Sequence, residues 1–173
     1  MSKPIAILSA SRTPLGGMMG SLSVLSAPQL GAAAIRSAVE RAAIDPSQVD
    51  EVLMGCVLTA GVGQAPARQA ALAAGLTQST ACTTINKVCG SAMKSVMMAS
   101  NALRAGQATI ALAGGMESMS RAPYLIPQGR QGYRFGHAQM LDHMQYDGLQ
   151  DAYQGVAMGN FAEKCASKYQ FSR

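Results

Sequence analysis

The stretch Thr80–Gly115, TACTTINKVCGSAMKSVMMASNALRAGQATIALAGG, indicates the class of fold. We predict a strand at 80–88 and a second strand at the fully apolar run 109–113. Between them, residues 89–104 place apolar side chains at helical spacing, and Gly106 follows as a helix-ending residue. A strand, a helix and another strand in this order are typical of a parallel sheet.

The same alternation is found closer to the N-terminus. We expect strands at the short apolar run Ile5–Leu8 and at Val49–Leu58. Helices are expected at about Ser26–Ala43, which starts with a Ser-x-x-Gln capping box, and at Gln64–Ala74. The pattern predicts a layered α/β fold with a mainly parallel, buried sheet.

The character of the sequence changes after Ser118. Prolines and glycines recur at short intervals, His, Met and Tyr residues follow, and a last helix is expected at Ala157–Tyr169. We therefore predict a first α/β domain at residues 1–118 and a separate, loop-rich region at residues 119–173.

Composition narrows the possible functions. The 173 residues are 49% hydrophobic and 13% charged, with a net charge of +5 that suits an anionic ligand. The basic residues are scattered except for Arg121, Arg130 and Arg134, and five Tyr and three Phe offer little base stacking, so we expect no nucleic-acid binding. No apolar run has the length of a signal sequence or a membrane span, which predicts a cytoplasmic protein that does not enter a membrane.

The four cysteines lack the spacing of zinc sites and of secreted disulfide frameworks, so we expect neither a metal nor a disulfide. Cys89 differs from the others because a predicted helix starts there. The N–H groups of a helix N-terminus stabilise a thiolate, and the small residues 90–92 leave room for a substrate. The alternative is a small residue packed between strand and helix, which is our interpretation of Cys56, Cys82 and Cys165.

Several segments, in order along the chain, resemble the thiolase family. They are Ser11–Pro14, Gly63–Gln69, Asn86–Ala92, Gly114–Ser120, Asp147–Leu149, Met158–Gly159 and Ala162–Glu163. The resemblance implies two similar α/β domains with a loop domain inserted in the first, of which this chain holds the N-terminal part. It also implies an acyltransferase of fatty acid metabolism in which acyl-CoA acylates Cys89 before a reversible Claisen reaction. Coenzyme A enters as part of the substrate, and no separate cofactor is implied.

The resemblance implies further catalytic groups in the second half of the polypeptide. These are a histidine that activates the nucleophile, a second cysteine that acts as acid and base, and an asparagine that positions a water. We therefore expect the chain to be inactive alone and to need the thiolase C-terminal half as a partner, within a homodimer or homotetramer. His137 and His143 lie in a loop-rich segment and are not expected to replace the missing base.

Three residues are candidates for substrate binding by resemblance. Leu149 and Met158 match positions that line the pantetheine and acyl pocket, although such residues are often plain packing residues. Arg134, together with Arg130 and His137, matches a cationic loop at which a neighbouring subunit meets the CoA nucleotide. An ordinary solvated loop is the alternative, and the sequence leaves both open.

The sequence also leaves the identity of the substrate undecided. The first expectation is an acetyl-CoA acetyltransferase that makes or cleaves acetoacetyl-CoA. Ala157 occupies a position at which short-chain members commonly carry a histidine, which keeps a degradative 3-ketoacyl-CoA thiolase of broader chain length as an alternative. A non-catalytic CoA-binding or oligomerisation module is a further alternative, because the second half is not in this chain.

Overall fold

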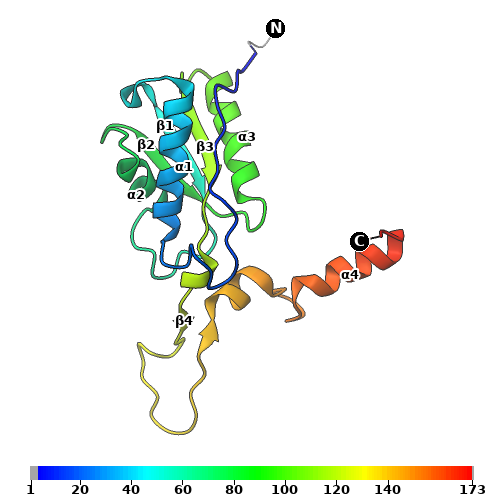
Figure 1. Cartoon of the computed structure of the whole chain (residues 1–173). Coiled ribbons are helices and arrows are strands. Elements are labelled where there is room, and N and C mark those ends of the chain that lie inside the picture. Colours follow the sequence, from blue (N-terminus) through cyan, green and yellow to red (C-terminus); the bar gives the residue numbers. More distant parts are fainter. Residues whose placement is uncertain (1–3, 173) are drawn as a thin grey trace. The chain divides into compact units, whose positions relative to one another are not determined.

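The structure is a computed structural model that describes residues 4–172 (Figure 1). Its contacts divide the chain into two compact units, with the division between Arg121 and Ala122. The assignment of residues 1–118 and 119–173 to separate domains stays a prediction.

The first unit is built on a sheet of three parallel strands. These are β1 (Glu51–Gly55), β2 (Ala81–Ile85) and β3 (Ala111–Gly115), in the order β2-β1-β3. β1 lies in the middle and pairs over its whole length with both neighbours. Because the strands are parallel, their carboxyl ends lie at one edge of the sheet.

Helices cover both faces of this sheet (Figure 1). α1 (Ala27–Ala42) and α2 (Pro66–Ala73) pack against each other on one face, and α3 (Ser91–Arg104) lies on the other. Val52 in β1 is fully buried in the core beneath α1 and α2, whereas the next residue, Leu53, faces α3. The predicted layered α/β fold with a parallel sheet is thereby confirmed.

α1 begins at the predicted capping box. The Ser26 hydroxyl accepts the N–H of Gln29 at 3.4 Å, and the Gln29 side-chain oxygen accepts the N–H of Ser26 at 2.8 Å. The helix ends at Ala43, which has a left-handed φ of 51°, and the short 3-10 helix Pro46–Gln48 leads into β1. Local signals were sufficient to predict this element.

The prediction of a strand at Ile5–Leu8 is wrong. These residues pair with no strand, and Ile7 is 86% exposed. The chain is held here by a side chain, because the hydroxyl of Ser9 donates to the carbonyl of Ala38 in α1 at 2.6 Å. A short apolar run indicates burial but specifies no pairing partner, and a strand exists only where a partner is present.

The other strands differ from expectation in their bounds. The strands expected at 49–58 and 80–88 are shortened to β1 and β2, because the chain leaves the sheet in turns after Gly55 and Ile85. The strand expected at 109–113 is β3, at Ala111–Gly115. A second 3-10 helix, Met119–Arg121, closes the first unit.

The second unit has little regular structure. Its elements are the antiparallel strands β4 (Tyr124–Leu125) and β5 (Leu141–Asp142), the π-helix Gln145–Leu149, and α4 (Met158–Tyr169). Residues 126–140, which connect β4 and β5, contain neither helix nor strand. α4 confirms the last helix expected from the sequence.

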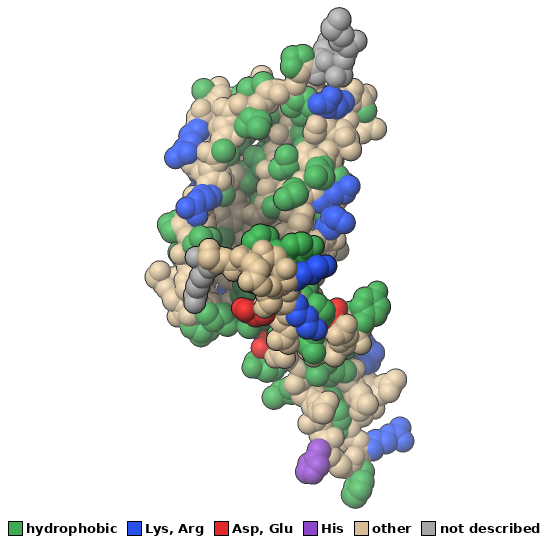
Figure 2. All heavy atoms as spheres, turned by 90° about the vertical axis from the view of Figure 1, so that its right-hand side faces the viewer, with side chains coloured by type: hydrophobic (Ala, Val, Ile, Leu, Met, Phe, Trp, Pro, Cys, Tyr) green, Lys and Arg blue, Asp and Glu red, His purple; other side chains and the backbone are tan. Residues whose placement is uncertain are grey.

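The outward side of α3 exposes apolar side chains. Met93, Val96 and Met97 are 66%, 52% and 53% exposed. Figure 2 looks onto this side of the first unit and shows hydrophobic side chains across it, with Lys and Arg side chains toward its margins. Within residues 4–172, no helix combines the length and the apolar character needed to cross a bilayer.

Candidate active site

A tight turn connects the end of β2 to the start of α3 and carries Cys89. The side-chain oxygen of Asn86 accepts the N–H of Val88 at 2.9 Å. The Ser91 hydroxyl accepts the N–H of Lys87 at 2.8 Å and donates to the carbonyl of Val88 at 2.6 Å. Side chains on both sides of the cysteine thus fix the backbone of the turn.

Val88 has a backbone conformation that is unusual for a β-branched residue. Its φ is 45°, in the left-handed region. Such conformations cost on the order of 1–3 kcal/mol and persist where the surroundings enforce them, often at functional sites. A sharp turn between strand and helix also displays the nucleophile of α/β-hydrolases, and here the residue after Val88, Cys89, is exposed.

The helix expected to start at Cys89 begins at Ser91, with Gly90 as its N-cap. The cause is the turn itself, because the N–H groups of Gly90 and Ser91 donate to the carbonyls of Lys87 and Val88 at 3.0 and 3.1 Å. Cys89 therefore precedes the cap instead of lying in the first helical turn. The N-terminus of α3 lies two residues further along the chain.

Two glycines allow α3 to approach the sheet closely. A Cβ atom on Gly55, at the end of β1, would lie 2.7 Å from the Cβ atom of Ser91. A Cβ atom on Gly115, at the end of β3, would lie 2.8 Å from the Cβ atom of Ala92. Side chains do not tolerate such distances, so glycine is required at both strand ends to seat the helix start behind Cys89.

Glu117 fastens the loop after β1 to the end of β3. Its carboxylate accepts the N–H of Val57 at 2.8 Å and the N–H of Leu58 at 3.2 Å, and the Cys56 thiol lies 3.7 Å away. Burial, followed by the negative charge and hydrogen bond of Glu117, raises the pKa of the Cys56 thiol to about 12. Cys56 is therefore protonated and unreactive at neutral pH.

The remaining cysteines lack the setting of Cys89. Burial raises the pKa of the half-buried Cys82, although the nearby positive charge of Arg68 opposes this effect. Cys165 is exposed but lies within α4, away from any helix start. All four cysteines are free, and within residues 4–172 no three His, Cys, Asp or Glu side chains are grouped in a way that could hold a metal ion.

Leu149 and Met158 lie on either side of a short bridge in the second unit. Gln150 and Ala157 form an isolated antiparallel bridge, which Leu149 precedes as the last residue of the π-helix and Met158 follows as the first residue of α4. Their exposed fractions are 40% and 48%. Two apolar side chains of neighbouring segments are therefore available to a ligand at this point.

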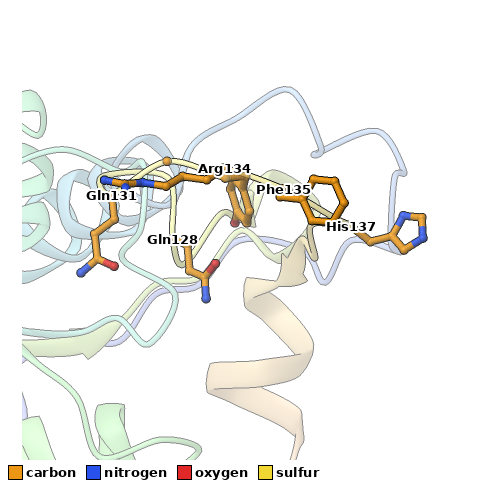
Figure 3. Close-up of a pocket in the computed structure, with 7 residues that line it drawn as sticks. Gln128, Gln131, Arg134, Phe135 and His137 are labelled. Atoms are coloured by element: carbon orange, nitrogen blue, oxygen red, sulfur yellow. The ribbon is translucent and has the colours of Figure 1, made fainter.

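Arg134 lies in the irregular segment between β4 and β5. It lines an open depression of about 680 Å³ together with Gln131, Phe135 and His137. Figure 3 shows the Arg134 side chain extending toward Gln131, whereas Phe135 and His137 extend the other way. Arg130 is not among the lining residues, so the structure places Arg134 and His137, but not Arg130, around one depression.

The sequence and the fold of the chain can be compared with those of known proteins. A family model for the thiolase N-terminal domain matches residues 5–173. The chain belongs to the thiolase family. The resemblance expected from the sequence motifs is confirmed over essentially the whole chain.

Individual thiolases extend the comparison. The chain is 50% identical to acetyl-CoA acetyltransferase 2 of Arabidopsis thaliana over 99% of its length and 42% of that relative. It is 52% identical to the acetyl-CoA acetyltransferase of Cupriavidus necator over 98% of its length and 43% of that relative. The Acat5 thiolase of Ascaris suum, solved in complex with coenzyme A, superposes with a TM-score of 0.90 at 42% identity, covering 96% of this chain and 43% of that one. The chain thus spans well under half the length of these thiolases.

The thiolase turn contains groups that sequence reasoning missed. The conformation of Val88 and the two hydrogen bonds of the Ser91 side chain were not expected. Glycine at the ends of two strands was a usable signal, since it often marks a close backbone approach, but the sequence does not say what approaches. The catalytic role of Cys89 and the binding roles of Leu149, Met158 and Arg134 stay predictions.

Proposed function

We propose that this chain is the nucleophile-bearing part of a thiolase, an acyl-CoA C-acyltransferase, and that Cys89 carries the acyl group. The observation that supports it is the exposed cysteine held on a rigid turn between β2 and α3. Its relatives at about half identity are named acetyl-CoA acetyltransferases. Formation or cleavage of acetoacetyl-CoA is accordingly the proposed reaction.

In the first step, the thiolate of Cys89 attacks the carbonyl carbon of acetyl-CoA. A bond forms between the cysteine sulfur and the acyl carbon, the bond from that carbon to the CoA sulfur breaks, and CoA leaves as a thiolate that takes up a proton. The N–H groups of Lys87, Val88, Gly90 and Ser91 donate inside the turn. The N–H of Cys89 is therefore our candidate for holding the oxyanion of the tetrahedral intermediate.

In the second step, the carbanion of another acetyl-CoA attacks the acyl group and expels the Cys89 thiolate. This step needs a base, and family resemblance assigns that role to residues of the C-terminal half. We therefore propose that this chain acts together with such a half in a homo-oligomer, that CoA enters with the substrate, and that no further cofactor takes part. A cytoplasmic location and a role in fatty acid metabolism stay predictions from the sequence.

One observation favours a second candidate function. Ala157, a small residue, is the N-cap of α4 directly before Met158, where short-chain family members commonly carry a histidine. A smaller side chain beside the proposed acyl pocket would leave room for longer acyl groups. A degradative 3-ketoacyl-CoA thiolase of broader chain length is therefore the alternative, and relative rates with acetoacetyl-CoA and longer 3-ketoacyl-CoA substrates distinguish the two.

The test uses a joined polypeptide, in which this chain is followed by the C-terminal remainder of the Cupriavidus necator relative. After brief incubation with acetyl-CoA and digestion with trypsin, mass spectrometry should find one acetyl group on the peptide Val88–Lys94. Cys89→Ser should abolish this label, whereas Cys165→Ser, which alters the other exposed cysteine, should leave it unchanged. Acetyl label on a cysteine peptide that persists in the Cys89→Ser protein contradicts the proposal.

A further inference from the structure

His143 is the most deeply buried residue of the second unit. It is 5% exposed, and every other described residue after Arg121 is at least partly exposed. Burial of a polar ring is costly unless its nitrogen atoms are hydrogen-bonded, so a small unit would be expected to bury an apolar side chain first. The position of His143 therefore calls for a specific hydrogen-bonding role.

The bonds of His143 connect the strand pair to the π-helix. Its backbone N–H donates to the carbonyl of Pro123 at 3.2 Å, which extends the pairing of β4 and β5. Its Nδ1 atom lies 2.6 Å from Oδ2 of Asp147. Because a carboxylate can only accept hydrogen bonds, Nδ1 is the nitrogen that carries a hydrogen, and it donates a hydrogen bond to Asp147.

Asp147 lies in the middle of the π-helix Gln145–Leu149. The Asp142 carboxylate accepts the N–H groups of Met144 and Gln145 at 2.9 and 3.4 Å at the start of this helix, and π-helical turns are rare, short and frequent at functional sites. The side chain of Asp147 is 45% exposed and that of His143 only 7%, so the bond reaches from the surface into the interior. The bond joins the first residue of the helical stretch 143–149 to a residue one turn further on, and the backbone bond from His143 to Pro123 connects this stretch to the strands.

The chain after Leu149 is fastened separately. The N–H of Asp151 donates to the carbonyl of Val156 at 2.8 Å, and the Asp151 carboxylate accepts the N–H of Gln154 at 2.6 Å. This closed loop places Ala157 opposite Gln150. Leu149 is thus fixed from its C-terminal side by the loop and from its N-terminal side by the helical stretch, which the bonds of Asp142 and the bond between Asp147 and His143 hold.

From this arrangement we infer that Asp147, acting through His143, is a positioning residue for acyl-CoA binding. The bond between them steadies the helical stretch that ends at Leu149, next to the bridge between Gln150 and Ala157, so that the Leu149 side chain is presented to the pantetheine arm of the substrate. The inference rests on the proposed function, which supplies the substrate. Asp147 itself touches neither the substrate nor Cys89 and acts only on the geometry of the binding segment.

The test compares three variants of the joined polypeptide. Asp147→Ala removes the acceptor, Asp147→Asn keeps an oxygen that can accept from Nδ1, and Gln145→Ala alters an exposed side chain of the same π-helix as the control. For Asp147→Ala we expect the KM for acetyl-CoA to rise about tenfold with kcat changed less than about twofold, the pattern of lost binding without lost chemistry. Asp147→Asn should recover most of the affinity, and Gln145→Ala should match the unaltered protein.

A second measurement follows the structure directly. Hydrogen exchange of the amides at 149–158 should be faster in Asp147→Ala than in Gln145→Ala, because the helical stretch before the binding segment loses one of the bonds that hold it. Unchanged exchange, or faster exchange with a KM equal to that of the control, overturns the inference. If the unaltered joined polypeptide fails to bind acetyl-CoA, the proposed function falls and the inference with it, whereas binding that is insensitive to Asp147 overturns the inference alone.

Discussion

The position of Cys89 depends on residues that have no side chain. Gly55 and Gly115 end two neighbouring strands, and a Cβ atom on either would collide with the first turn of α3. The start of α3 cannot move away from the sheet without disturbing a second contact, because the hydroxyl of Ser95 in α3 also donates to the carbonyl of Gly114 at 2.8 Å. Cys89 is thus placed by contact between the sheet and the helix as much as by its own turn.

This placement predicts the effect of Gly115→Ala. The added methyl group must displace α3, so we expect a loss of about 1–3 kcal/mol in the free energy of unfolding, as for other overpacked sites. In the joined polypeptide, acetylation of Cys89 should also slow. Urea unfolding and the acetyl label measure the two effects. Gly90→Ala is the control for stability, because a Cβ atom there has no neighbour closer than 3.5 Å, and an equal loss of stability in that variant would refute the explanation.

The sequence predicted the candidate site only in part. Cys89 could be proposed because a strand, small residues and a helix follow one another within a short stretch, which is local information. The fit of Gly55 against Ser91 joins residues far apart in the chain and depends on the exact approach of two elements. Val88 gave no signal, since its left-handed conformation is imposed by its surroundings against its own preference.

Among the elements, those defined by local bonds were predicted best. α1 has its start in a capping box between Ser26 and Gln29, and both bonds are present in the structure. The strand expected at Ile5–Leu8 required a partner strand, which the sequence of this segment does not identify. No strand pairs with these residues in the structure. The difference is physical, because helix hydrogen bonds close within four residues whereas parallel strands must find distant partners.

The cap of α1 therefore predicts the outcome of Ser26→Ala. Loss of the hydroxyl leaves a helix N–H without its acceptor, and we expect about 1 kcal/mol less stability in urea unfolding. Ser37→Ala is a matched control within the same helix, where alanine favours the helical state and stability should be unchanged or slightly higher. Equal effects of the two substitutions would show that the capping box does not stabilise α1.

At the scale of the whole molecule, low charge and exposed apolar surface occur together. Only 13% of the residues are charged, and α3 leaves Met93, Val96 and Met97 exposed on its outward side (Figure 2). Surface of this kind often marks a site of interaction with other protein. This agrees with the proposal that the chain acts with a thiolase C-terminal half, since it spans well under half the length of its relatives.

The contrast between the two units predicts the pattern of limited proteolysis. Trypsin should cut first after Arg130 and Arg134, because residues 126–140 lack helix and strand, and cleavage requires a locally open backbone. Arg36 and Arg41 are followed by peptide bonds within or at the end of α1, beside the buried core, so cleavage there should be at least about tenfold slower. Mass spectrometry of a time course identifies the sites. The double substitution Arg130→Gln and Arg134→Gln should delay the first cleavage, and early cleavage in α1 would show that the first unit is not the stable part of this chain.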